Sequence, residues 1–258
     1  MPHNVFTWLL MPLSGASEHH IATWVAWHGR LMVVSWAVLL PTGVLAARYF
    51  KVLPQQSWPA ELDNKTWWHA HQTFQWGGVL LMTAGLILAW CNAPGASSLA
   101  RAHGTLGWCI GAAGWLQIAG GLARGTKGGP SDQRHRDHRS CGSLRGDHYD
   151  MTPRRVAFEL VHKVLGTSAI LAALLAIATG LVVADAPRWM ALVLTSWVCL
   201  LGVLVVRWQR QGRCVDTYQA IWGPDVAHPG NQKQPIGYGI HRYTARTWKR
   251  RWRTQRHD

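Results

Sequence analysis

The sequence predicts an all-α membrane protein with five transmembrane helices. Two observations support this fold class: apolar residues make up 48% of the chain, and they are gathered into long uncharged runs that short basic segments separate. A hydrocarbon core of about 30 Å takes roughly 20 helical residues to cross. Five runs are long enough or nearly so, and we expect spanning helices at 24–47, 67–90, 103–123, 157–183 and 190–206.

Tryptophan is unusually frequent, with 17 residues, and many of them lie near the ends of the apolar runs. Amphipathic indole rings favour the lipid headgroup zone, so we interpret them as interface anchors. The first 23 residues hold only a short apolar run, Val5 to Leu13, with no basic region before it. We therefore expect neither a signal peptide nor a further spanning helix there. The five cysteines are scattered without a CxxC spacing, which gives no support to a disulfide framework or a zinc site.

The net charge of +14 could suggest a nucleic-acid partner, but membrane topology explains its distribution more simply. If the helices alternate in direction, segments 48–66, 124–155 and 207–258 share one side and hold 22 of the 26 lysines and arginines. The positive-inside rule makes that side cytoplasmic. We expect a short extracytoplasmic segment 1–23, a basic cytoplasmic loop 124–155 and a basic cytoplasmic tail 207–258, and no nucleic-acid partner. The histidines of the loop receive no role, because a charge-mixed polar loop explains them.

Four of the five predicted helices carry a histidine near their beginning. An ionisable side chain inside a spanning helix is costly, so it is normally partnered and marks a functional site. Since successive helices run in opposite directions, His28 would meet His103 at the outer face, and His71 would meet His162 at the inner face. Axial ligation of haem iron requires one imidazole on each side of the macrocycle. The pattern favours two haems, each held by one histidine pair.

The alternative for any one histidine is an interhelical hydrogen bond, and the glycines near all four are compatible with simple helix packing or with the approach of a macrocycle. Four histidines at one depth in alternating register are harder to explain by packing alone. Among neighbouring candidates we prefer His71 to His69, which lies about 200° away around the helix. His19 and His20 rank below His28.

The first and third predicted helices begin alike, with HGRL at 28–31 and HGTL at 103–106, and both end on a similar glycine-to-arginine run. This similarity hints at a duplicated unit of two helices. Under that interpretation the second and fourth helices are equivalent as well.

These residues together resemble the cytochrome b561 family, and most closely its branch that is often fused to DOMON domains. The resemblance covers roughly residues 24–206. It rests on His28-Gly29-Arg30-Leu31-Met32, Pro41-Thr42-Gly43, Ala47-Arg48-Tyr49-Phe50-Lys51, the run from Trp67 to Gln75, His103-Gly104 and His162-Lys163-Val164-Leu165-Gly166. It implies that the first four helices form a haem-binding four-helix bundle with two haem b groups. It also implies electron transfer across the membrane, typically from cytosolic ascorbate to an outer acceptor such as monodehydroascorbate or ferric iron.

The chain departs from that family in two respects. Members commonly have six spanning helices, whereas five are predicted here, and no room for a DOMON domain precedes His28, so the outer acceptor is undefined. The compact chain without organellar signals suggests a multi-pass protein of a bacterial inner membrane, with its N-terminus outside and its C-terminus in the cytoplasm. A donor other than ascorbate therefore stays open.

Bis-histidine ligation leaves iron no open position, which favours outer-sphere electron transfer over oxygen activation. An enzymatic role would be that of a transmembrane oxidoreductase of the ferric reductase or monodehydroascorbate reductase type. One alternative is a cytochrome b subunit that anchors a dehydrogenase or exchanges electrons with quinone. Another is a transporter or scaffold whose histidines carry protons or pack helices.

Arg48 and Lys51 end the first predicted helix at the cytoplasmic face. They are candidates for binding an anionic reductant through focused positive charge, or they are ordinary positive-inside anchors. We expect membrane lipid and a small-molecule or protein electron donor and acceptor as partners, and we leave a homodimer open.

Overall fold

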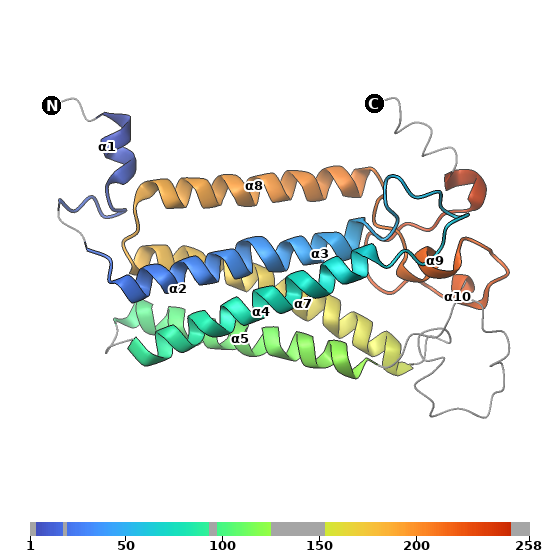
Figure 1. Cartoon of the computed structure of the whole chain (residues 1–258), viewed down its shortest axis with the longest axis horizontal. Helices are drawn as coiled ribbons and strands as arrows, with labels where there is room; N and C mark the ends of the chain where they lie inside the picture. The colour runs from blue at the N-terminus through green and yellow to red at the C-terminus, as the bar shows by residue number, and fades with distance from the viewer. Residues whose placement is uncertain (1–3, 18–19, 93–96, 125–152, 249–258) are drawn as a thin grey trace. The chain divides into compact units, whose positions relative to one another are not determined.

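The computed structural model describes residues 4–17, 20–92, 97–124 and 153–248, and helices make up nearly all of their regular structure (Figure 1). Five helices are long and apolar enough to cross a membrane, as the sequence predicts. They are Thr23–Tyr49, α4 (Thr66–Asn92), α5 (Ser98–Ala123), α7 (Pro153–Val183) and α8 (Arg188–Arg210). Each contains its predicted range and extends slightly beyond it, because a helix can continue past the hydrocarbon core that hydropathy detects.

The first spanning helix changes its hydrogen-bond pattern midway. It consists of α2 (Thr23–Val33), a π-helical segment η1 (Val34–Leu39) and α3 (Leu40–Tyr49). Pro41 has no N–H, so the carbonyl of Ala37 loses its usual helical donor. The indole Nε1 of Trp197 in α8 donates to that carbonyl at 2.7 Å. The irregular turn therefore occurs where a neighbouring helix supplies the missing hydrogen bond.

The chain divides into two compact units, and all five spanning helices contribute residues to both. The first unit comprises Met1–Gly43, Gln72–Ile118 and Leu165–Val205, and the second comprises Val44–His71, Ala119–Val164 and Val206–Asp258.

In the first unit, four spanning helices share one apolar core. Its buried side chains are Trp36, Leu40, Val79, Met82, Ile110, Ala169, Ala173 and Ala176. Glycines allow the helices to approach closely: a Cβ built on Gly78 would lie 2.7 Å from Leu40 Cγ, and one on Gly111 would lie 2.6 Å from Leu86 Cδ1. Small residues at helix contacts are typical of membrane bundles. The fifth long helix, α8, buries none of its residues, as expected of a helix that faces lipid.

The N-terminal segment of the first unit begins with a short helix, α1 (Val5–Leu10), whose apolar side chains are mostly exposed. The chain then binds the connection between α7 and α8. Leu13 N donates to Ala186 O at 3.1 Å, and Ser14 Oγ donates to Asp185 Oδ2 at 2.6 Å. With six residues, α1 is too short to cross a membrane.

In the second unit, the chain after α8 folds into a C-terminal lobe, residues 213–248, where the sequence predicted only a basic tail. The lobe contains α9 (Thr217–Trp222) and α10 (Pro229–Gln232). One cluster of buried side chains joins it to the connection between α3 and α4, and comprises Val52, Trp58, Val215, Ala220, Tyr243 and Trp248. A second cluster comprises Tyr218, Ile221 and Trp222, with Ile236 packed against it. Aromatic residues thus give this short segment a core of its own.

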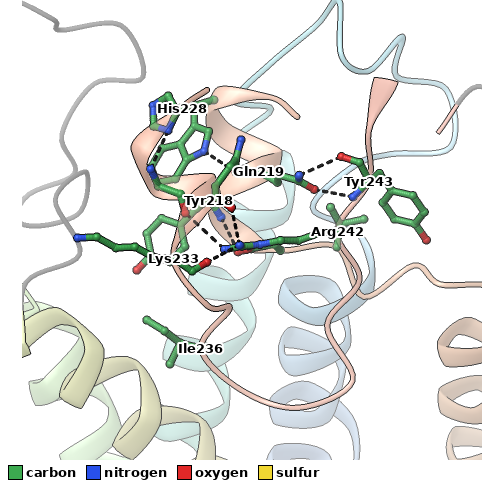
Figure 2. A network of polar contacts seen from close by, with 12 residues as sticks. Tyr218, Gln219, His228, Lys233, Ile236, Arg242 and Tyr243 are labelled. Carbon is green, nitrogen blue, oxygen red and sulfur yellow. Dashed lines mark hydrogen bonds and ion pairs between the residues drawn. The ribbon is translucent and has the colours of Figure 1, made fainter. Parts of the chain in front are cut away.

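Polar contacts fix the path of the lobe (Figure 2). Asp216 caps α9 by accepting from Tyr218 N at 3.1 Å, and its other oxygen accepts from Arg242 Nε at 2.5 Å. The same guanidinium donates to the carbonyls of Asn231 and Lys233. An arginine that binds a carboxylate and main-chain carbonyls together crosslinks segments distant in sequence.

Lys51 is buried in this unit, with 7% of its surface exposed, and its Nζ donates to the carbonyl of Val215 at 3.0 Å. Desolvation lowers the pKa of Lys51 to about 8, against partial opposition from the nearby Cys214 and Asp216. A buried ammonium is unfavourable, so this residue makes folding depend on pH.

We expect Lys51→Met to change that pH dependence. Lys51 releases its proton near pH 8 when folded and near its ordinary pKa of 10.5 when unfolded. Between these values the unfolded state binds more protons, so the stability of the wild type rises with pH. The buried ammonium therefore lowers the free energy of unfolding by its full amount below pH 8. This destabilisation has largely disappeared by pH 10.5. Relative to Lys51→Met, the wild-type free energy of unfolding should rise by on the order of 3 kcal/mol across this window.

Denaturant unfolding of detergent-solubilised protein, followed by circular dichroism from pH 7 to 10.5, measures this difference. Lys65→Met, at an exposed lysine of the same connection, is the control and should follow the wild type. The prediction would be contradicted if the free energies of unfolding of the wild type and Lys51→Met differed by the same amount over the whole pH window.

Candidate functional site: two histidine pairs

The structure brings the four predicted histidines together in the two predicted pairs. In the first unit, the ring centroids of His28 (α2) and His103 (α5) lie 6.1 Å apart with the ring planes at 80°. In the second unit, the ring centroids of His71 (α4) and His162 (α7) lie 6.3 Å apart at 75°. All four side chains are half-buried. Each pair joins two different spanning helices, as alternating helix directions require.

Hydrogen bonds to main-chain carbonyls orient the first pair. Nδ1 of His28 lies 2.9 Å from the carbonyl oxygen of Gly85 in α4. Nδ1 of His103 lies 3.1 Å from that of Ala176 in α7, with Thr179 Oγ1 at 3.4 Å. A carbonyl only accepts, so the proton of each neutral imidazole belongs on Nδ1. The lone pair is then on Nε2, which is the arrangement found for histidines that bind a metal.

The spacing of both pairs suits a metal ion between two imidazoles. With a metal–nitrogen distance of about 2 Å and about 1.1 Å from that nitrogen to its ring centroid, two imidazoles on one metal have centroids about 6 Å apart. Among the described residues no group of three or more His, Cys, Asp or Glu could hold a metal ion. Two protein ligands suffice where a macrocycle supplies the equatorial nitrogens, as in haem. The donor set therefore fits haem better than a bare metal ion.

Aromatic rings flank the second pair. The Trp68 ring centroid lies 6.1 Å from that of His71, and the Phe158 centroid lies 5.2 Å from that of His162. The guanidinium carbon of Arg124 lies 3.9 Å from the Trp68 ring centroid. Each histidine of the second pair therefore has an aromatic neighbour, and a cation–π contact binds one of these neighbours to Arg124.

The glycines near the histidines fall into two groups. A Cβ on Gly77, Gly78, Gly111, Gly114 or Gly166 would meet a side chain of a neighbouring helix within 4 Å. Helix packing accounts for that group. A Cβ on Gly29, Gly104 or Gly107 would meet nothing within 4 Å, so the surface beside His28 and His103 has room for a flat group.

The candidate reductant-binding residues lie in the second unit. Lys51 is the buried lysine bound to the Val215 carbonyl, described above. Arg48 is half-buried, and its guanidinium donates to Gln209 Oε1, to the carbonyl of Tyr238 (both at 3.2 Å) and to Tyr49 OH at 3.1 Å. Arg48 is thus the more accessible of the two, and reductant binding stays a prediction for both.

The competing histidines are placed as follows. His69 and His20 are exposed. His19 and the histidines of the 124–155 loop, His135, His138 and His148, lie outside the described residues.

Sequence reasoning missed the partners that orient the first pair: the carbonyls of Gly85 and Ala176, and Gly180, where a Cβ would lie 2.9 Å from His103 Cε1. One spacing in the sequence could have indicated the two carbonyl acceptors. Gly85 follows His71 by fourteen residues in α4, and Ala176 follows His162 by fourteen residues in α7. Fourteen residues are nearly four helical turns, so each acceptor shares a helix face with a candidate ligand. The same spacing agrees with a duplicated pair of helices.

Comparison with known proteins finds two similar plant proteins. A cytochrome b561, DM13 and DOMON domain-containing protein of Arabidopsis thaliana is 25% identical over 154 residues, which are 60% of this chain and 14% of that protein. A cytochrome b561 and DOMON domain-containing protein of the same plant is 40% identical over 58 residues, 22% of this chain and 12% of that protein. The matched segments are thus small parts of much longer relatives. No family model matches the chain. No solved structure matches it either.

Proposed function

We propose that the protein is a transmembrane b-type cytochrome that carries electrons between two haems, one at the His28–His103 pair and one at the His71–His162 pair. The observation that supports this most directly is the ring spacing of 6.1 and 6.3 Å, which two imidazoles on one iron require. The similarity to two proteins with cytochrome b561 in their names supports the same function.

The residues of the chain have distinct tasks in this function. Each histidine pair would hold one haem through its two imidazoles, and the haem would supply outer-sphere electron transfer. The carbonyls of Gly85 and Ala176 hold the Nδ1 protons of the first pair and so direct Nε2 toward the site. Trp68 packs beside the ring of His71, and Phe158 packs beside the ring of His162. Ligands that are held in a fixed orientation reduce the structural rearrangement that accompanies electron transfer.

The direction of transfer is part of the proposal. The distribution of basic segments favours the cytoplasmic side for the His71–His162 pair, where a soluble reductant such as ascorbate or another anionic donor would deliver electrons. The acceptor beyond the His28–His103 pair would be ferric iron, an organic radical or a protein.

The proposal predicts two spectral components in the reduced-minus-oxidised spectrum of purified protein, with two haems b per chain. His28→Ala and His103→Ala should remove the same component, because each deprives one haem of an axial ligand. His71→Ala and His162→Ala should remove the other. Haem quantitation and the spectrum of each variant measure this.

His69→Ala is the matched control, because His69 is an exposed histidine two residues from His71. It should keep both components. A purified wild type without haem would refute the cytochrome. Loss of the same single component in His28→Ala and His162→Ala would refute the pairing.

Orientation is tested separately. Of the 26 basic residues, 22 lie in segments 48–66, 124–155 and 207–258, so we expect these segments in the cytoplasm. Alkaline phosphatase fused after residue 95 should be active, and a fluorescent protein fused after residue 140 should fluoresce. Phosphatase activity of a fusion after residue 140 would reverse the orientation and exchange the sides of the two haems.

Arg48 is the candidate for attracting an anionic reductant, since it is the more accessible of the two cations and a positive charge raises the local concentration of an anion. We expect Arg48→Gln to slow haem reduction by ascorbate several-fold at low salt and much less at high salt, because exposed charges are screened beyond about 8 Å at physiological ionic strength. Stopped-flow absorbance measures the rate. Arg207→Gln, at an exposed arginine near the end of α8, is the control. Equal rates for Arg48→Gln and wild type at low salt would leave Arg48 as a membrane anchor.

A further inference from the structure

A buried carboxylate lies one helical turn before His162. Glu159 in α7 is 5% exposed, and Lys163 Nζ donates to its Oε2 at 2.7 Å. Its Oε1 accepts from Arg155 Nη2 at 3.0 Å and from the hydroxyl of Tyr218 at 2.9 Å. Two cations and a hydroxyl stabilise the negative charge of this buried carboxylate. Both Glu159 and Lys163 act electrostatically on His162.

The C-terminal lobe contacts α7 through Glu159 and Lys163, which precede and follow His162. Tyr218 is 1% exposed and its ring stacks on Trp222, with centroids 5.1 Å apart. Lys163 Nζ, besides its bond to Glu159, donates to the carbonyl of Ile236 at 2.7 Å. The lobe therefore binds α7 at the residue three before His162 and at the residue directly after it.

The lobe is built to hold Tyr218 in one place. Asp216 caps the helix that begins one residue before Tyr218, and Arg242 binds Asp216 from a segment 26 residues later. Gln219, next to Tyr218, exchanges two hydrogen bonds with the main chain of Tyr243, at 3.0 and 2.9 Å (Figure 2). Contacts on both sides of Tyr218 leave its hydroxyl little freedom to leave Glu159.

We propose that the C-terminal lobe tunes the His71–His162 site, and that Tyr218 is a positioning residue. Its hydroxyl holds the Glu159 carboxylate one helical turn from His162. The proposal rests on the proposed function, because it assigns the lobe to one of the two haems.

The chemical consequence concerns the reduction potential of that haem. A fixed negative charge near the ligand favours the more positive, oxidised state and so lowers the potential. The Tyr218 hydroxyl and the two cations offset part of that charge. Removing the charge should therefore raise the potential, whereas removing only the hydroxyl should expose more of the charge and lower it.

Two conservative variants test this by redox titration of the purified full chain. Glu159→Gln keeps the side-chain shape and removes the charge, and Tyr218→Phe keeps the stacked ring and removes the hydroxyl. We expect the first to raise and the second to lower the midpoint of the component that His162→Ala eliminates. The component that His28→Ala eliminates should keep its midpoint and so serves as an internal reference.

Tyr243→Phe is the matched control. It makes the same substitution in the same lobe, where the lost hydroxyl donates to the Gly212 carbonyl at 2.8 Å. It should leave both midpoints unchanged, while limited proteolysis shows how far each variant loosens the lobe.

Opposite shifts distinguish the proposed role from a structural one, because loosening the lobe would admit water and move the midpoint in the same direction for both variants. Shifts of the same sign, or no shift in Tyr218→Phe, would overturn the proposal while two wild-type components keep the cytochrome intact. A wild type without haem would overturn both. If Glu159→Gln does not fold, the downward shift of Tyr218→Phe, absent in Tyr243→Phe, decides the question.

Discussion

A polar group inside an apolar helix bundle has to find its partner within the protein, because lipid offers none. In the first unit this constraint explains several contacts between helices. The Ala37 carbonyl, deprived of a donor by Pro41, accepts from Trp197, and the buried hydroxyl of Ser35 donates to the Gly78 carbonyl at 2.8 Å. The imidazoles of His28 and His103 obey the same rule. Helix packing and ring orientation thus have one physical cause.

The spans and the histidine pairs could be predicted from the sequence because both follow from local information. Hydropathy marks the helices, and alternating direction then dictates which helix ends meet. The acceptors of the imidazole protons could not be predicted in this way, since a main-chain carbonyl has no residue signature. The π-helical turn was also missed: Pro41 signals a break, but only the position of Trp197 shows how the break is satisfied.

The C-terminal lobe escaped prediction for a different reason. Its interactions join residues far apart in sequence, such as Asp216 with Arg242 and Tyr218 with Glu159, and they show no periodicity. Positive charge near membrane helices is a strong indicator of helix orientation. Interpreting the basic residues in this way does not reveal that some of them have structural roles. The sequence makes Lys51 a candidate for reductant binding or a positive-inside anchor, and the structure shows its ammonium buried and bound to the Val215 carbonyl. Charge counts are a guide to the orientation of membrane helices, but they do not separate solvated cations from those that bind the fold together.

The main-chain acceptors of His28 and His103 limit how this pair can vary in evolution. A substitution at Gly85 or Ala176 changes a side chain and leaves the accepting oxygen in place, so no point mutation at these two positions deletes the acceptor. Evolutionary change in the position of these acceptors must instead come from residues that set the position of the backbone. Met32 is an example, because its Cε would lie 3.0 Å from a Cβ on Gly85. The packing of the helices therefore determines the orientation of these two rings. That orientation would persist even if the residues whose carbonyls accept the protons were substituted.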